Sequence, residues 1–380
     1  MFTSLAIAVT AVICGHKYPA QIERELIRFA QHALSEPQRS VRKKKQISQK
    51  TTEARLYGVC ASLNTLLDPG FAIKTLDHVG AKHIAALHAS WCEVGGRHQK
   101  SSGRIHNLNC YLRLLFDLHL GKHGLVKPVS FYAADCKRTY AAVEDKSWEG
   151  QNLDVEAIIG GIAAQGGDHQ IVAAQLELCL AFGLRVSESW LARPLQLLDE
   201  GIGREILRIQ HGTKGGRPRD LPLIELAQLD VLTRVASFAR GQHQTMIPVR
   251  YSLPQWRNRY YTIVRAHGLQ RDNEGGSLGV TTHGLRHQYL HALYKRLTGC
   301  DAPIKGATTI AMDTHRAALK TLIEHAGHSD VRKASAYLGS PTLIRKLDRL
   351  KAAMRASEPT PTEAPPLLTT PAQNPAGEQA

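Results

Sequence analysis

Six basic or hydroxyl-bearing residues in the second half of the chain have the types and the order suited to chemistry on a phosphate. They are Arg185, Lys214, His283 with Arg286, His328, and Tyr337 nine residues later. An arginine donates two parallel hydrogen bonds to a phosphate, and a histidine can donate or accept a proton near neutral pH. A lone tyrosine is more often a packing residue. Only its place in this ordered set makes Tyr337 a candidate for chemistry on a phosphate.

Two of these groups have a spacing that predicts their local structure. Gly183 ends an apolar helix, Arg185 lies in the turn that follows, and Glu188 can reach back to Arg185 across one helical turn. Taken alone, that pair is better explained by an ordinary structural ion pair. His283 and Arg286 are three residues apart, so on a helix they share a face, although a solvated polar face explains such a pair too.

The elements that must position these residues are mostly helices. Apolar residues recur at helical spacing over 19–36, 51–67, 76–91, 102–120, 155–165 and 171–182, and residues 225–356 are mainly helical with loops. Residues 205–211 alternate apolar and polar side chains, residues 221–224 resemble a second strand, and Gly215-Gly216 between them predicts a β-hairpin. The expected fold class is mainly α with a small antiparallel β-sheet (α+β).

Length and local composition divide the chain into five segments. Its 380 residues favour two domains. We expect an N-terminal extension and basic linker over 1–44, a compact basic helical domain over 45–130 and a linker over 131–152. A second domain over 153–356 and a disordered tail over 357–380, rich in Pro, Thr, Ala and Glu, complete the chain.

The charge balance indicates a polyanionic partner. Lys and Arg total 48 against 33 Asp and Glu, a net charge of +15. Nucleic acid is the leading candidate, and a merely basic protein is the alternative.

Seven scattered cysteines, odd in number and without a CxxC pair, argue against a zinc site and a disulfide framework. The apolar run over 2–15 follows no Lys or Arg and is too short to span a bilayer, so we do not expect export.

Four motifs in this order resemble the tyrosine recombinases, also called the phage integrase family. They are GLRxSE at 183–188, the hairpin segment TKGGRPRDLPL at 213–223, HGLRH at 283–287 and AGHSDxxxxxxY at 326–337. The resemblance covers residues 45–350, is strong in the catalytic domain and is only architectural before it. It implies that residues 45–130 form a helical SAM-like core-binding (DNA-binding) domain and that residues 153–356 form a tyrosine recombinase catalytic domain.

The resemblance also implies catalytic roles. Tyr337 would attack a DNA phosphorus and leave a 3′-phosphotyrosine, which conserves the phosphodiester energy, so that no ATP is needed. Arg185 and Arg286 would hold the non-bridging oxygens. Lys214, in the hairpin, would protonate the departing 5′-oxygen.

The remaining implied roles support this set. His283 would assist proton transfer near Tyr337, His328 would donate a hydrogen bond to the phosphate, and Glu188 would orient Arg185. No metal or other cofactor is implied. The basic residues that we expect to contact DNA are Arg42, Lys43, Lys44, Lys45, Arg217 and Arg219.

The chain departs from the family pattern at a few positions. Forty-one residues separate Arg286 from His328, more than the family usually has, so residues 299–314 are expected to form an inserted loop. Ala326 stands where the family usually has leucine. His287 and His325 are additional histidines, expected to be structural or on the surface. Tyr289 and Tyr294 are rival nucleophiles, but they follow Arg286 too closely and lack the preceding Gly-His.

The implied partner is double-stranded DNA with an inverted-repeat core site, bound by a homotetramer on synapsed DNA, with a possible accessory directionality factor and no membrane. The expected role of this bacterial or phage-encoded protein is integration or excision of a mobile element, in the cytoplasm and at the nucleoid. Apolar residues at helical spacing over 343–354 either pack on their own domain or dock into a neighbouring protomer. Two alternatives remain: a catalytically inactive DNA-binding protein of the same fold, and a type IB topoisomerase.

Overall fold

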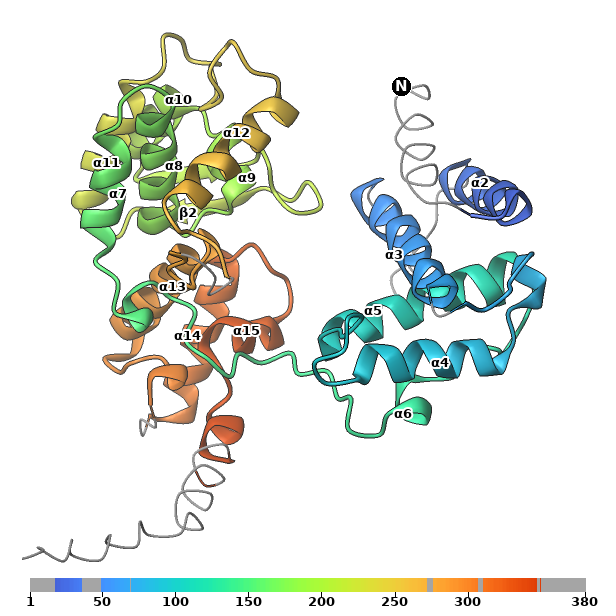
Figure 1. Cartoon of the computed structure of the whole chain (residues 1–380). Coiled ribbons are helices and arrows are strands. Elements are labelled where there is room, and N and C mark those ends of the chain that lie inside the picture. Colours follow the sequence, from blue (N-terminus) through green and yellow to red (C-terminus); the bar gives the residue numbers. More distant parts are fainter. Residues whose placement is uncertain are drawn as a thin grey trace, which may run out of the picture. The chain divides into compact units, whose positions relative to one another are not determined.

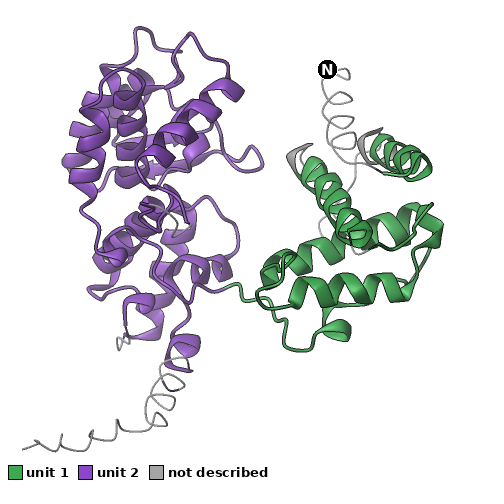
Figure 2. Ribbon diagram, viewed as in Figure 1, with its two compact units in different colours: residues 1–140 green, residues 141–380 purple. Residues whose placement is uncertain are grey.

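The computed structural model describes residues 18–35, 49–68, 70–271, 276–306, 310–346 and 349. The chain divides into two compact units, residues 1–140 and 141–380 (Figure 2). This boundary lies inside the linker that we expected over 131–152. The expected basic arm (Arg42, Lys43, Lys44 and Lys45), the apolar run over 2–15 and the tail over 357–380 lie outside the described residues.

The first unit is helical. Its elements are α2 (Ala20–Ser35), α3 (Gln49–Leu67), η1 (Leu76–His78), α4 (Ala81–Cys92), α5 (Ser102–Arg113), the π-helical turn η2 (Leu114–His119) and α6 (Val129–Tyr132) (Figure 1). Its core buries Trp91, Leu112 and Phe116. Helix α2 buries Leu26 and Phe29 in the same core, so this part of the expected N-terminal extension belongs to the unit.

The second unit is built around α8 (Asp168–Phe182), which packs against α7 (Val155–Ala163), α9 (Val186–Leu191), α11 (Ala227–Ala236), α12 (Leu253–Ala266) and α13 (His283–Thr298). Helix α8 is buried on most of its circumference, as a helix apolar on all sides must be. Trp148, from the expected linker, is fully buried in this core. Its indole Nε1 donates a hydrogen bond to the carbonyl of Thr281, 2.8 Å away.

A two-stranded antiparallel sheet follows α10 (Pro194–Arg204) and confirms the predicted fold class. Strand β1 (Ile206–Ile209) pairs with β2 (Arg219–Pro222), and Ile209 lies opposite Arg219. The second strand thus begins two residues before the expected range. Gly215 and Gly216 adopt φ values of +76° and +65° in the connecting loop, a conformation that favours glycine.

The last elements form a separate apolar cluster within the second unit. Helices α13, α14 (Met312–His325) and α15 (Ser335–Leu338) lie beside one another (Figure 1), and η5 (Val331–Ala334) leads into α15. The expected inserted loop over 299–314 contains the 3₁₀ turn η4 (Pro303–Lys305) and the start of α14. Ala302 from this segment is buried in the same cluster as Tyr337. No described helix has both the length and the apolar character needed to cross a membrane.

Candidate active site

The turn after α8 places Arg185. Gly183 ends the helix with a left-handed φ of +59°, and a Cβ at this position would lie 2.3 Å from Cδ1 of Tyr289. Only glycine fits here without displacing that ring. The chain then extends, and Arg185 becomes the N-cap of α9. The predicted position of Arg185 in a turn between two helices is confirmed.

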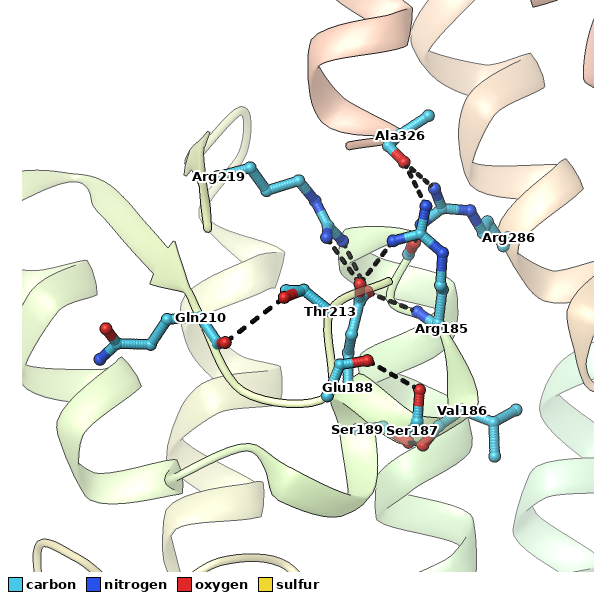
Figure 3. Close-up of polar contacts among 12 residues, drawn as sticks. Arg185, Val186, Ser187, Glu188, Ser189, Gln210, Thr213, Arg219, Arg286 and Ala326 are labelled. Carbon is cyan, nitrogen blue, oxygen red and sulfur yellow. Dashed lines mark hydrogen bonds and ion pairs between the residues drawn. The ribbon is translucent and has the colours of Figure 1, made fainter. Parts of the chain in front are cut away.

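Glu188 lies at the centre of an arginine cluster (Figure 3). Arg219 donates to both carboxylate oxygens, from Nη1 and Nη2, at 2.7 Å each. Arg185 donates to Oε1 from Nη1 at 2.6 Å, and its backbone N–H donates to Oε2 at 2.8 Å. The Glu188 side chain is completely buried. Glu188 therefore holds Arg185 as expected, together with a second arginine.

The ionised form of Glu188 is strongly favoured. Burial alone would raise the pKa of this carboxyl group. The hydrogen bonds from Arg219 and the charges of Arg219 and Arg185 outweigh burial and lower the pKa to about 2. At neutral pH one carboxylate therefore faces two guanidinium groups, and the cluster keeps an excess of positive charge.

Arg286 lies beside Arg185, and both side chains donate to the carbonyl of Ala326. Arg286 is fully buried on α13 and donates to the carbonyls of Gly183 and Ala326. Nη2 of Arg185 donates to the carbonyl of Ala326 as well, at 2.8 Å (Figure 3). Gly327 follows with φ +60°, and a Cβ there would lie 3.1 Å from Arg219. The carbonyl in this backbone turn brings the guanidinium groups of Arg185 and Arg286 together.

Tyr337 lies beside Arg286. Its hydroxyl is 3.1 Å from Nε2 of His328 and 3.4 Å from Nε of Arg286. The Arg286 guanidinium carbon is 5.6 Å from the centre of the tyrosine ring. The residue is only 6% exposed. The structure thus brings together Arg185, Arg286, His328 and Tyr337, four of the six residues expected to be catalytic.

The two expected catalytic histidines are held in the neutral form. Burial, with the charges of Arg185, Arg286 and Lys214, lowers the pKa of His328 to about 4. Desolvation by the surrounding protein and the charges of Arg286 and Arg185 also lower the pKa of His283, which begins α13. The ring centre of His283 is 6.2 Å from that of Tyr337. His328 is therefore the histidine within hydrogen-bonding distance of the hydroxyl.

The hairpin loop approaches the site, but Lys214 does not contact it. Lys214 is exposed, and no hydrogen bond or ion pair joins it to the described site residues. Arg217, from the same loop, donates to the hydroxyl of Ser329 at 3.1 Å. Arg219 is buried against Glu188, so its side chain is not exposed for the DNA contact that we expected.

The rival tyrosines have their hydroxyl groups engaged elsewhere. The hydroxyl of Tyr289 is 2.8 Å from Nδ1 of His325, and that of Tyr294 is 2.8 Å from Nδ1 of His315. His325 is buried, which fits the expected structural role. His287 is also buried, and its ring centre lies 5.0 Å from that of Tyr337.

Sequence reasoning missed Arg219 as a partner of Glu188. A signal was available: Leu221 lies on the buried side of β2, and Arg219 is two residues before it, so it shares that side. Placing the start of the strand at residue 221 hid this alternation. The sequence could not indicate that the Ala326 carbonyl binds both arginines, because every residue type supplies a backbone carbonyl.

Comparison with known proteins identifies the fold. Residues 155–292 match a family described as integrase, a range that includes Arg185, Lys214, His283 and Arg286. A lambda integrase dimer bound to a COC′ core site is similar, with 14% identity, a TM-score of 0.52, and coverage of 86% of this chain and 79% of that one. The fold is that of the tyrosine recombinases.

A second group of similar structures is the Tn1549 transposon integrase. In complex with transposon right end DNA it gives a TM-score of 0.50 at 13% identity, and covers 86% of this chain and 99% of that one. In complex with circular intermediate DNA it gives a TM-score of 0.50 at 12% identity, and covers 85% of this chain and 99% of that one. No curated protein sequence matches the chain. The predicted resemblance to tyrosine recombinases is confirmed.

Proposed function

We propose that this protein is a site-specific DNA recombinase that cuts and rejoins DNA through a 3′-phosphotyrosine at Tyr337. The observation that carries the proposal is the convergence of Arg185 and Arg286 on the Ala326 carbonyl, beside a tyrosine hydroxyl that contacts His328. Glu188 pairs with Arg185 and Arg219, and no described carboxylate pairs with Arg286, so the guanidinium groups of Arg185 and Arg286 keep a positive charge that suits an anion. A phosphate diester is the anion that a tyrosine nucleophile and these arginines suit together.

The arginines stabilise the charge that builds on phosphorus. A guanidinium carries five N–H donors, and the described hydrogen bonds of Arg286 use three of them. The remaining donors of Arg286 and Arg185 can bind the two non-bridging oxygens of the phosphate. Because the protein holds both groups in place before the reaction, little reorganisation is needed when the pentacoordinate phosphorane forms.

The nucleophile loses its proton to a neighbouring histidine. A bond forms between the Tyr337 oxygen and phosphorus, the bond from phosphorus to the 5′-oxygen breaks, and the tyrosine proton passes to a base. The resemblance gave His328 a hydrogen bond to the phosphate, but its Nε2 lies 3.1 Å from the Tyr337 hydroxyl, so we propose that neutral His328 accepts the proton when its own proton is on Nδ1. His283, at the start of α13, assists. The lowered pKa values keep both histidines neutral near pH 7, the form in which a ring nitrogen can accept a proton.

The departing 5′-oxygen takes a proton from Lys214. The loop that carries this lysine reaches the Gly327–Ser329 turn through Arg217 and Ser329. We propose that Lys214 moves to the phosphate when DNA binds. Rejoining is the reverse: a 5′-hydroxyl attacks the phosphotyrosine and Tyr337 is released, so no ATP is required.

The substrate that we propose is a double-stranded inverted-repeat core site, bound by four protomers on synapsed DNA, in the cytoplasm at the nucleoid. The helical first unit and the net charge of +15 support backbone contacts. Arg217 remains a candidate contact on the exposed hairpin loop. Integration or excision of a mobile element is the role that fits this chemistry, with an accessory factor to set its direction.

The proposal is tested with a nicked suicide substrate, which traps the covalent complex. Wild-type protein should form a complex that survives denaturing electrophoresis, and Tyr337→Phe should form none while still binding the duplex. An adduct with Tyr337→Phe refutes the assignment. DNA binding without an adduct from wild type favours an inactive binding protein, and relaxation of supercoiled DNA that lacks a target site favours a type IB topoisomerase.

A further inference from the structure

The nucleophile lies on a helix too short to hold itself in place. Helix α15 spans only Ser335–Leu338, and the last carbonyls of any helix lack partners within it. A single helical turn is unstable without tertiary contacts. Its backbone carbonyls must therefore be bound by other elements if the Tyr337 hydroxyl is to stay beside Arg286 and His328.

His291 binds the carbonyl of Tyr337 itself. Its Nε2 lies 2.9 Å from that oxygen, and the side chain is buried, at 3% exposure. Because a carbonyl only accepts hydrogen bonds, Nε2 must carry the proton. His291 lies on α13 four residues after His287 and eight after His283, so the three histidines share one face of the helix that also carries Arg286.

Residues 142–147 of the second unit lie beside this contact. On the far side of the His291 ring, Oδ1 of Asp145 lies 3.6 Å from Nδ1 and accepts hydrogen bonds from the backbone N–H and the hydroxyl of Ser147, at 2.8 and 2.7 Å. The backbone N–H of Ala142 donates to the carbonyl of Ser335, 2.8 Å away, in the first turn of α15. The carbonyls of Ser335 and Tyr337 are thus both bound from outside the helix.

The same segment also touches the start of α13. A Cβ at Gly284 would lie 2.5 Å from the carbonyl oxygen of Lys146 and 2.6 Å from the ring of Trp148. The indole of Trp148 donates to the carbonyl of Thr281, two residues before His283. Residues 142–148 therefore contact both the helix that carries Arg286 and the helix that carries Tyr337.

We propose that His291 is a positioning residue for the nucleophile, and that the backbone N–H of Ala142 completes the support of helix α15. This inference rests on the proposed recombinase function. His291 donates to a backbone carbonyl and touches no reacting atom in the proposed mechanism. Its loss should leave phosphate binding intact and let the Tyr337 hydroxyl move away from the line of attack.

The test replaces His291 by Gln, Asn and Leu. The Gln amide nitrogen reaches about as far as Nε2 and can donate to the carbonyl, whereas the Asn amide is one methylene shorter and the Leu side chain has no donor. We expect Leu and Asn to slow single-turnover adduct formation on the suicide substrate by about 10- to 100-fold at saturating protein. Gln should stay within about threefold of wild type. Duplex affinity should be unchanged in all three.

A control separates positioning from general destabilisation. His325→Leu removes another buried histidine of the second unit, one that bonds Tyr289 and not Tyr337. It measures the loss of cleavage that follows when a buried histidine near the site, but not bonded to Tyr337, is removed. If the Leu variant of His291 precipitates, the Gln and Asn pair still carries the test, since both side chains are neutral amides.

Three results overturn the positioning role but not the proposed function: wild-type cleavage by the Asn and Leu variants, cleavage by the Gln variant as slow as that by Asn, and a loss no larger than that of His325→Leu. The absence of any adduct from wild-type protein overturns the proposed recombinase function, and this inference falls with it.

Discussion

Replacing Glu188 by Gln should destabilise the second unit by about 3 kcal/mol. The arginines lower the pKa of Glu188 from its ordinary 4.5 to about 2. Since a tenfold change in proton affinity corresponds to about 1.4 kcal/mol, the folded protein favours the ionised carboxylate by about 3 kcal/mol. The carboxyl is fully buried, so solvent screens little of this energy. The Gln variant also leaves the buried Arg219 without its counter-charge.

The stabilisation by ionised Glu188 should also depend on pH. A carboxyl whose pKa is lower in the folded than in the unfolded state stabilises the fold fully above about pH 4.5. That stabilisation is lost as the pH falls toward 2. Glu188→Gln should remove this contribution, so the free energy of unfolding should fall less steeply with acid in the variant than in wild type.

The assay is urea unfolding of the full chain followed by tryptophan fluorescence. Trp148, Trp190 and Trp256 lie in the second unit and only Trp91 in the first, so the signal reports mainly the second unit. Asp220→Asn is the matched control, because its ion pair with Arg208 is exposed, at 54% and 48% of the side chains, and should contribute under about 1 kcal/mol. A loss in Glu188→Gln no larger than in this control would refute the electrostatic argument.

Three further predictions concern the turn, the histidine and the lysine of the site. Gly183→Ala should cost at least about 2 kcal/mol, because its Cβ meets Tyr289, whereas Gly299→Ala, with φ +71° and open space, should cost about 1 kcal/mol; equal melting temperatures would contradict this. NMR titration should give His328 a pKa near 4, and a value near 6.5 would show that burial and the arginines do not act on it. Lys214→Ala should slow cleavage by about 100- to 1,000-fold, and a substrate with a sulfur leaving group at the 5′ position should restore it; no rescue would exclude an acid role.

The sequence was sufficient for contacts that are local along the chain. Arg185 and Glu188 are three residues apart, and helix geometry predicts their contact. The spacing of His283 and Arg286 likewise predicts a shared helix face, and both lie in the first turn of α13. The order of the motifs pointed to Tyr337, whose hydroxyl does lie beside Arg286 and His328.

Contacts between distant segments could not be predicted in this way. Arg219 is 31 residues from Glu188, and only the pairing of β2 with β1 places it on the buried side. His291 reaches the Tyr337 carbonyl across 46 residues, and the acceptor is a backbone atom that any residue type supplies. Both depend on tertiary packing, which local periodicity does not encode.

Peptide mapping of the trapped covalent complex tests the central claim most directly. After protease and nuclease digestion, mass spectrometry should find a nucleotide phosphate on the peptide that contains Tyr337. Tyr289→Phe and Tyr294→Phe should still form the adduct, and Tyr337→Phe should not. A nucleotide on any other residue, or an adduct that survives Tyr337→Phe, would contradict the assignment of the nucleophile.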